Sequence, residues 1–327
     1  MKRGIFSSIL NNEAYAESDK EWKVELQRFH KYWYDLAVNT NEVAEYFDTR
    51  KIIVDYLKSV KKDVEQNLEK RFVYFICSRT KVRFNAKKKP FFNPLTKKVK
   101  IQLLIGKKKK KKNIYCKFFD ISVGKFTKPR IDLTNKYITI TDSNGDLTTS
   151  SVHDFLDGSN INLGISSNVE YVGYTKNPHT RPTNGSHTGL SDTLYKVSNE
   201  DCDTLIYFNI FKVITEASNK KSNFKFAVAN SMTDEIGSEI EGKLIEKCFI
   251  FYFDAINQSR NKEDELSELK KNLVKMAQDN KISSITFYYE FENLNDYAIF
   301  SSSLVKPNFC HKFSVSLEND RVEIKRF

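Results

Sequence analysis

The stretch Asp203–Ala217, "DTLIYFNIFKVITEA", is crowded with β-branched and aromatic residues, and this composition predicts a long strand. A shorter strand is expected upstream at Val169–Thr175, "VEYVGYT". Downstream, residues 233–257, "TDEIGSEIEGKLIEKCFIFYFDAIN", predict a helix whose N-terminal cap is Thr233 or Asp234. This part of the chain is therefore expected to combine strands with a helix.

The C-terminal residues continue the mixture of helix and strand. The segment "KEDELSELKKNLVKMAQDN", residues 262–280, has the apolar spacing of an amphipathic helix with one face in solvent. Three closing strands are expected in "ISSITFYYEF", "DYAIFSSSLV" and "HKFSVSLENDRVEIKRF", which cover residues 282–291, 296–305 and 311–327.

Residues 18–76 are expected to be helical. Trp22, Leu26, Phe29 and Trp33 recur at spacings of three and four, as on one face of an α-helix. Their aromatic side chains are most simply explained as core packing.

Residues 80–142 change to short β-rich runs separated by turn residues. A hexalysine, Lys107–Lys112, lies between two of these runs and is expected at a hairpin tip. Neighbouring positive charges repel one another unless counterions or phosphates neutralise them, so we expect this region to bind nucleic acid. A solvated loop is the alternative for the hexalysine alone. The expected binding residues are Lys87, Lys88, Lys89, Lys107, Lys108, Lys109, Lys110, Lys111 and Lys112.

Charge divides the chain of 327 residues, whose net charge is +11, into two unequal parts. Residues 1–130 hold 32 Lys and Arg against 14 Asp and Glu, whereas the remainder holds 21 against 28. The polar, turn-rich segment Thr141–Asn160 is typical of a domain junction. We therefore expect a basic, helical and β-rich nucleic-acid-binding region at residues 1–140 and an acidic domain at residues 141–327, whose carboxylates a divalent metal could use.

Composition argues against several classes of protein. No apolar run reaches the length of about eighteen residues that a transmembrane helix needs, and the N-terminus lacks the apolar core of a signal peptide. The five cysteines are scattered and never form C-x-x-C, which fits reduced thiols in a cytosol better than a zinc cluster or a disulfide framework. No G-x-S-x-G motif is present, so a serine hydrolase is not expected. The oligomeric state is left open.

The segment Glu170–Gly189, "EYVGYTKNPHTRPTNGSHTG", gathers groups that donate, accept or shuttle a proton. Hydrolysis of a phosphodiester needs a deprotonated water, a cation that neutralises the developing charge and usually a metal ion. Tyrosine or histidine can relay the proton, arginine can bind the phosphate and glutamate can hold the metal. This segment and the glutamates of the helix at residues 233–257 together offer such a set.

The pattern "YVGYTKNPHTRP" resembles the second strand and following turn of GIY-YIG nucleases. "EGKLIEKCFIFYFDAIN" resembles that family's helix with a metal-binding glutamate and a later asparagine. The resemblance covers about residues 165–260. It implies a small α/β domain with a three-stranded antiparallel sheet and flanking helices, which cleaves DNA with one divalent metal such as Mg²⁺.

The resemblance also implies a role for each matching residue. Tyr171 would lie on the second family strand, and Arg181 would clamp the phosphate. His187 would handle the proton. Glu241 would ligate Mg²⁺, and Asn257 would brace the metal site. The chain is thus expected to be an α+β DNA endonuclease.

The family's first strand should supply a second tyrosine shortly before the strand that carries Tyr171. The preceding segment, "DGSNINLGISSN", contains no tyrosine, and the nearest strand-like one is Tyr137. Either an insertion separates the two strands or the first tyrosine is absent.

Each site residue also has an ordinary structural explanation. Tyr171 fits a half-buried core residue, His187 an exposed turn and Glu241 a solvated helix face, whereas Arg181 could pair with a surface acid. The main alternative to the endonuclease is therefore a non-catalytic nucleic-acid-binding protein with a degenerate nuclease fold. A third hypothesis is an interaction protein whose lysines meet acidic partners or anionic lipid.

Overall fold

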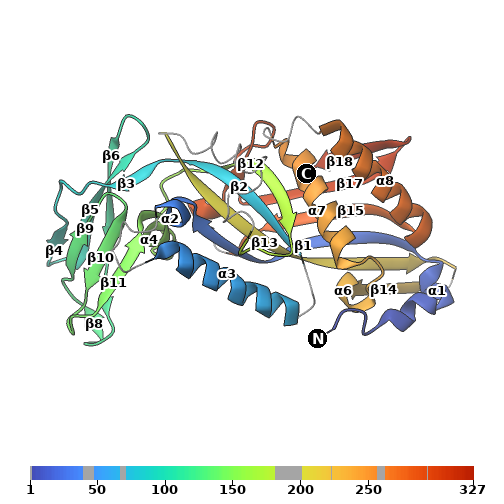
Figure 1. Ribbon diagram of the computed structural model, residues 1–327, viewed down its shortest axis with the longest axis horizontal. Helices are drawn as coiled ribbons and strands as arrows, with labels where there is room; N and C mark the ends of the chain where they lie inside the picture. Colours follow the sequence, from blue (N-terminus) through green and yellow to red (C-terminus); the bar gives the residue numbers. More distant parts are fainter. Residues whose placement is uncertain are drawn as a thin grey trace.

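The computed structural model describes residues 2–39, 48–66, 71–180, 201–221, 223–255, 262–292 and 294–327. Figure 1 shows an elongated molecule in which a long sheet flanked by helices carries a smaller β-rich part at one end.

A nine-stranded mixed sheet is the main layer of the molecule. Its strands are β1 (Asp19–Trp33), β2 (Phe72–Thr80), β12 (Ser167–Thr175), β13 (Cys202–Asn219), β14 (Phe224–Ala229), β15 (Ile282–Glu290), β16 (Phe300–Ser301), β17 (Cys310–Glu318) and β18 (Arg321–Arg326). Their order is β16-β12-β2-β13-β1-β15-β17-β18, with β14 also paired to β13. β13 pairs antiparallel with both β1 and β2, whereas β1–β15 and β12–β16 are parallel pairs.

Helices cover both faces of this sheet (Figure 1). α3 (Thr49–Gln66) packs on one face, and α7 (Ser238–Phe253) and α8 (Lys262–Asn280) pack on the other. The side chains of β2 alternate between the two cores, as successive residues of a strand must. Every second residue from Phe72 packs on the side of α3, and every second residue from Val73 packs on the side of α7. The sheet is therefore buried on both faces around β2 and β13.

A β-rich insertion, residues 82–151, separates β2 from β12, although these two strands are neighbours in the sheet. We call it the lysine-rich module. One of its sheets contains β3 (Val82–Phe84), β4 (Phe91–Asn93), β5 (Lys98–Ile105) and β6 (Lys110–Cys116). The other contains β9 (Arg130–Leu133), β10 (Tyr137–Thr141) and β11 (Leu147–Ser151), and a small hairpin pairs β7 (Phe119–Asp120) with β8 (Lys125–Phe126).

The two sheets of the module share one hydrophobic core. Inward-facing residues of β5 and β10 pack together with α4 (Val152–Gly158), which follows β11 directly. The Ser151 side chain caps α4 by accepting a hydrogen bond from the Asp154 N–H. Because this core is continuous with that of the large sheet, the module is anchored where it leaves β2 and returns to β12.

Short helices complete the described part of the chain. None of the described helices has the length and apolarity that a membrane span requires. The short elements are η1 (Ser7–Asn11), α1 (Glu13–Ala16), α2 (Asp35–Val38), α6 (Asn230–Thr233) and η3 (Asp296–Ala298).

The expectation of helix at residues 18–76 is wrong for its first part, which forms β1, and for its end, where β2 begins at Phe72. A β-bulge between Leu26 and Arg28 shifts the register of β1 against β13. Trp22 and Leu26 before the bulge and Phe29 and Trp33 after it therefore face the same core. One extra residue in a strand of period two creates spacings of three and four, which imitate a helix. The helix α3 is confirmed.

The expected small three-stranded domain is also wrong as a separate unit. β12, β2 and β13 do lie side by side and antiparallel, but they belong to the nine-stranded sheet. The expected domain boundary after residue 140 falls inside β10, and the large sheet takes strands from both sides of it. The reason is that β1 and β2 use β13 as their pairing partner, which no local pattern reveals.

Most other expectations for the second half of the chain are confirmed. The expected strand at residues 296–305 is largely wrong, because η3 occupies its start and β16 covers only Phe300–Ser301. The strands β12, β13, β15, β17 and β18 and the helices α7 and α8 form where the sequence predicts them. The expected helix cap is wrong, because Thr233 ends α6 and Asp234 adopts a left-handed conformation that terminates it. Gly237 is the residue that precedes α7.

Candidate functional site

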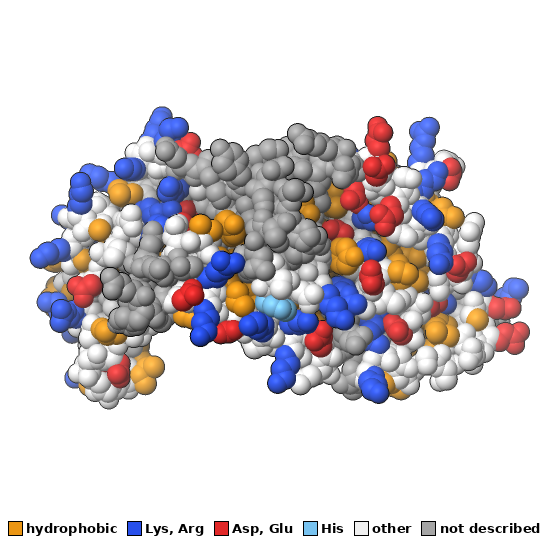
Figure 2. Space-filling view, in the orientation of Figure 1, with side chains coloured by type: hydrophobic (Ala, Val, Ile, Leu, Met, Phe, Trp, Pro, Cys, Tyr) orange, Lys and Arg blue, Asp and Glu red, His pale blue; other side chains and the backbone are white. Residues whose placement is uncertain are grey.

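The lysine-rich module concentrates positive charge at one end of the molecule. Residues 82–151 contain 18 Lys and Arg against four Asp, a net charge of +14, whereas the whole chain carries +11. Figure 2 shows Lys and Arg side chains projecting around this end of the visible face. The module is therefore more positive than the whole protein, and the rest of the chain is slightly acidic.

The hexalysine forms the tip and the first part of the second strand of the β5–β6 hairpin, as expected. Gly106 and Lys109 have positive φ angles that let the chain turn, and Lys110 begins β6. All six side chains are exposed. Lys107 makes an exposed contact of 3.3 Å with Asp201, and Lys112 Nζ donates to the Leu163 carbonyl. Exposed pairs of this kind contribute little stability, so the cations remain available to a polyanion.

A second group of cations lines a groove of about 630 Å³ between the two sheets of the module. Lys88 and Lys89 come from the loop before β4, Lys128 comes from the loop before β9, and Arg130 begins β9. Asp132 is the acidic residue among its lining residues, at 3.8 Å from Arg130. Four cations around one groove form a surface that suits phosphate groups. Lys87, beside the groove, is exposed.

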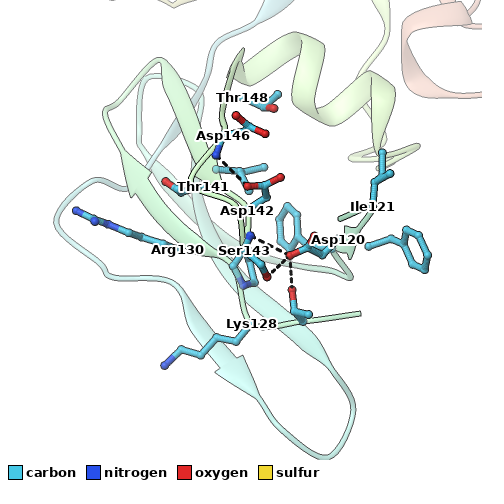
Figure 3. Close-up of a pocket in the computed structure, with 14 residues that line it drawn as sticks. Asp120, Ile121, Lys128, Arg130, Thr141, Asp142, Ser143, Asp146 and Thr148 are labelled. Carbon is cyan, nitrogen blue, oxygen red and sulfur yellow. Dashed lines mark hydrogen bonds between the residues drawn. The ribbon is translucent and has the colours of Figure 1, made fainter. Parts of the chain in front are cut away.

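A neighbouring pocket of about 420 Å³ contains carboxylates, but these organise loops (Figure 3). Asp120 accepts hydrogen bonds from the side chains and N–H groups of Ser122 and Ser143. These bonds hold the pKa of Asp120 well below its ordinary value. Asp142 accepts from the Asp146 N–H within the β10–β11 turn. Nothing in this arrangement directs the carboxylates at a shared metal ion.

Two tyrosines lie side by side on adjacent strands of the large sheet. Tyr171 in β12 and Tyr74 in β2 have stacked rings, with centroids 6.0 Å apart and planes inclined by 28°. Gly173 is the register partner of Tyr74. Tyr74, which lies in the region expected to be helical, is therefore the tyrosine beside Tyr171, whereas Tyr137 lies in β10 of the module. The β-rich run "FVYFIC" around Tyr74 was the signal for this strand.

Glu241 lies in the first turn of α7, where it is 4% exposed and firmly paired. Its Oε2 accepts hydrogen bonds from Asn230 Nδ2 at 2.6 Å and from Arg3 Nη2 at 3.1 Å. Arg3 also donates to Asp234 and to the Ile236 carbonyl. The carboxylate thus ties the N-terminal segment to the connection between α6 and α7, and it is not part of a solvated helix face.

The fold does not bring Tyr171 and Glu241 together. The Tyr171 ring packs with the core on the α3 face of the sheet, whereas α7 packs on the opposite face. The expected partners Arg181, His187 and Asn257 lie outside the described residues. Within the described ranges, no group of three or more His, Cys, Asp or Glu side chains could hold a metal ion. A Mg²⁺ site that includes Glu241 stays a prediction.

Glu246 is a second carboxyl on α7, and it is half-buried. Its Oε1 accepts a hydrogen bond from the Tyr174 N–H at 3.0 Å, which joins α7 to β12. Burial, reinforced by the negative charge of Glu265, raises the pKa of Glu246 to about 8, and the positive charge of Lys247 partly opposes this shift. Its carboxyl group is therefore protonated at neutral pH.

The chain matches no family model, no curated protein and no solved structure.

Gly173 is expected to be intolerant of a side chain. A Cβ built there would lie 2.5 Å from Cζ and Oη of Tyr74, whose ring is buried. Gly173→Ala should lower the free energy of unfolding by about 1–3 kcal/mol, the usual cost of overpacking a core. Urea denaturation checks this value, with Gly158→Ala as the matched control because a Cβ at Gly158 meets nothing within 4 Å. Equal stability of the two variants would show that the Tyr74 ring moves freely.

Proposed function

We propose that this protein binds DNA through the lysine-rich module. The observation that carries the proposal is the exposed hexalysine on the β5–β6 hairpin, accompanied by the cationic groove that Lys88, Lys89, Lys128 and Arg130 line. A surface of this charge attracts phosphates, and binding is driven by release of the counterions condensed on the nucleic acid. The remaining part of the chain is close to neutral, so the large sheet acts as the scaffold that presents the module.

Replacing Lys107–Lys112 with serines is expected to weaken DNA binding by on the order of tenfold or more near 0.1 M salt. All six lysine side chains extend from the hairpin into solvent, so the substitutions should leave folding unaffected. Fluorescence anisotropy of a labelled duplex measures the affinity. A variant with the same charge change outside the module is the control, with serines at the exposed lysines Lys220, Lys221, Lys225, Lys262, Lys271 and Lys275. Equal losses in the two variants would mean that net charge alone, and not the module, determines binding.

A second candidate function is phosphodiester cleavage beside the tyrosine pair. It is favoured by one observation, the stacked rings of Tyr74 and Tyr171 on adjacent antiparallel strands. Arg181 and His187 follow β12 in the sequence and would complete the site that the GIY-YIG resemblance implies. In this candidate the module binds DNA and the tyrosine pair marks where the backbone is cut.

Nicking of supercoiled plasmid in the presence of Mg²⁺ tests this candidate. Arg181→Lys should lower the rate about a hundredfold, because a lysine cannot donate two parallel hydrogen bonds to the phosphate as its charge develops. The control is Arg321→Lys, which changes an exposed arginine in β18. A wild-type protein that leaves the plasmid intact, or an Arg181→Lys variant that cuts at the full rate, rejects cleavage without affecting the binding proposal.

A further inference from the structure

The outer face of the β4–β5–β6 sheet carries a row of two aromatic side chains with a lysine between them. Phe91 in β4 is the register partner of Lys100 in β5, and Lys100 is the register partner of Tyr115 in β6. Residues directly opposite each other in antiparallel strands share a face. Adjacent strands are about 5 Å apart, which puts the two rings on the order of 10 Å apart across Lys100.

Both rings of this row face solvent. Phe91 is 63% exposed and Tyr115 is 58% exposed. The adjacent row of the same three strands, Phe92, Val99 and Cys116, packs into the hydrophobic core, which confirms that the aromatic row lies on the other face. A ring left in water forgoes the stabilisation that burial would give it. Two such exposed rings in one row indicate a binding surface.

Two further rows on the same face lead from the aromatic row toward the hexalysine. The next row on this face is a chain of amides, in which Asn85 Nδ2 donates to Gln102 Oε1 and Gln102 Nε2 donates to Asn113 Oδ1. Beyond it lies the exposed Lys111, paired with Leu104. Stacking surface, hydrogen-bonding amides and point charges thus follow one another on one side of a single sheet.

We propose that this outer face binds single-stranded nucleic acid, with bases stacked on Phe91 and Tyr115 and the phosphates between them near Lys100. This inference rests on the proposed function and specifies the form of its ligand. Aromatic side chains along a positively charged surface are the usual means of holding a single strand without sequence preference. A polyanion is the occupant because the module carries a net charge of +14.

A duplex does not use the aromatic row. Its bases are already stacked on one another inside the helix, so an exposed ring finds no base face to contact. A duplex would still meet the lysines, because phosphate contacts do not depend on strandedness. The aromatic row should therefore raise the affinity for single strands and leave the affinity for duplexes nearly unchanged.

The double variant Phe91→Ala/Tyr115→Ala tests this inference, since it leaves every charge in place. It should weaken binding of a single-stranded oligonucleotide by at least about 20-fold, because each stacked base contributes at least about a fivefold change in affinity. Duplex affinity should change less than about twofold. The matched control is Phe6→Ala/Tyr56→Ala, which removes two exposed rings outside the module. Separate titrations with single-stranded DNA, single-stranded RNA and duplex DNA of one sequence show whether the protein prefers single-stranded DNA or single-stranded RNA.

An indole at position 115 reports the contact directly. Trp22 and Trp33, the two native tryptophans, are both buried, so the indole introduced by Tyr115→Trp is the exposed one. Its fluorescence should be quenched when a single strand stacks on it and should change little with a duplex. The inference is wrong if the double alanine variant loses single-strand and duplex affinity equally. It is also wrong if that variant loses self-association but keeps its affinity for single strands and duplexes. Neither result contradicts DNA binding, which the lysine variants test separately. Failure of the wild type to bind any oligonucleotide would overturn both proposals.

Discussion

Glu241→Ala is expected to lower the free energy of unfolding by about 3–5 kcal/mol, the usual result of removing one partner of a buried ion pair. The side chains of Arg3 and Glu241 are 6% and 5% exposed. Alanine would leave the Arg3 guanidinium with Asp234, a more exposed partner, and would leave the Asn230 amide without the acceptor that it holds at 2.6 Å. It would also remove a negative charge from the first turn of α7, where the helix dipole favours one.

Glu239→Ala is the matched control, because Glu239 lies in the same turn. Its carboxylate is largely exposed and pairs with Lys243 at 3.2 Å, an arrangement that contributes less than about 1 kcal/mol. Urea denaturation of both variants gives the comparison. If Glu241→Ala is as stable as Glu239→Ala and yet abolishes Mg²⁺-dependent nicking, the carboxylate is a metal ligand and its structural role is rejected.

Glu246→Gln is expected to change how stability depends on pH. The folded pKa of Glu246, about 8, lies above the ordinary value of 4.5, so the folded state retains a proton that the unfolded chain releases. The stability that this proton gives is complete below pH 4.5 and is lost as the pH rises toward 8. Glutamine does not ionise, and its oxygen can still accept from the Tyr174 N–H. The variant should therefore gain roughly 2–4 kcal/mol relative to wild type between pH 4.5 and pH 8, since one pKa unit corresponds to about 1.4 kcal/mol.

The measurement is the difference in unfolding free energy between Glu246→Gln and wild type at several pH values. Taking this difference removes any constant effect of the amide group. Glu265, Lys247 and Glu268 are the charged groups that act on Glu246, and all remain in both proteins. A difference that stays constant from pH 4.5 to pH 8 would mean that Glu246 is ionised in the folded protein.

Local patterns in the sequence predicted local structure well. The hexalysine between two β-rich runs predicted the β5–β6 hairpin, and the apolar spacing of residues 262–280 predicted α8. These elements depend on residues close in sequence, so the pattern contains the information. β1 shows the limit of such patterns, because its bulge opposite β13 depends on pairing with a strand almost two hundred residues away.

The candidate site was harder to predict, for the same physical reason. Tyr74 lies beside Tyr171 only because the module is inserted between two strands that pair in the sheet. Similarly, the partner of Glu241 is Arg3, at the far end of the sequence, so the surrounding acidic residues suggested a solvated face instead. The aromatic row has no signature in the sequence, because Phe91, Lys100 and Tyr115 meet only through strand register.

The salt dependence of DNA binding tests most directly whether the lysine-rich module contacts phosphates. For duplex DNA, the logarithm of the association constant should fall linearly with the logarithm of the salt concentration, by about 0.9 units for each phosphate contacted. Replacing Lys107–Lys112 with serines should make this slope shallower by about two units or more, whereas the six-serine control outside the module should leave it unchanged. A slope that is the same in the wild type and the hexalysine variant would contradict binding through the module.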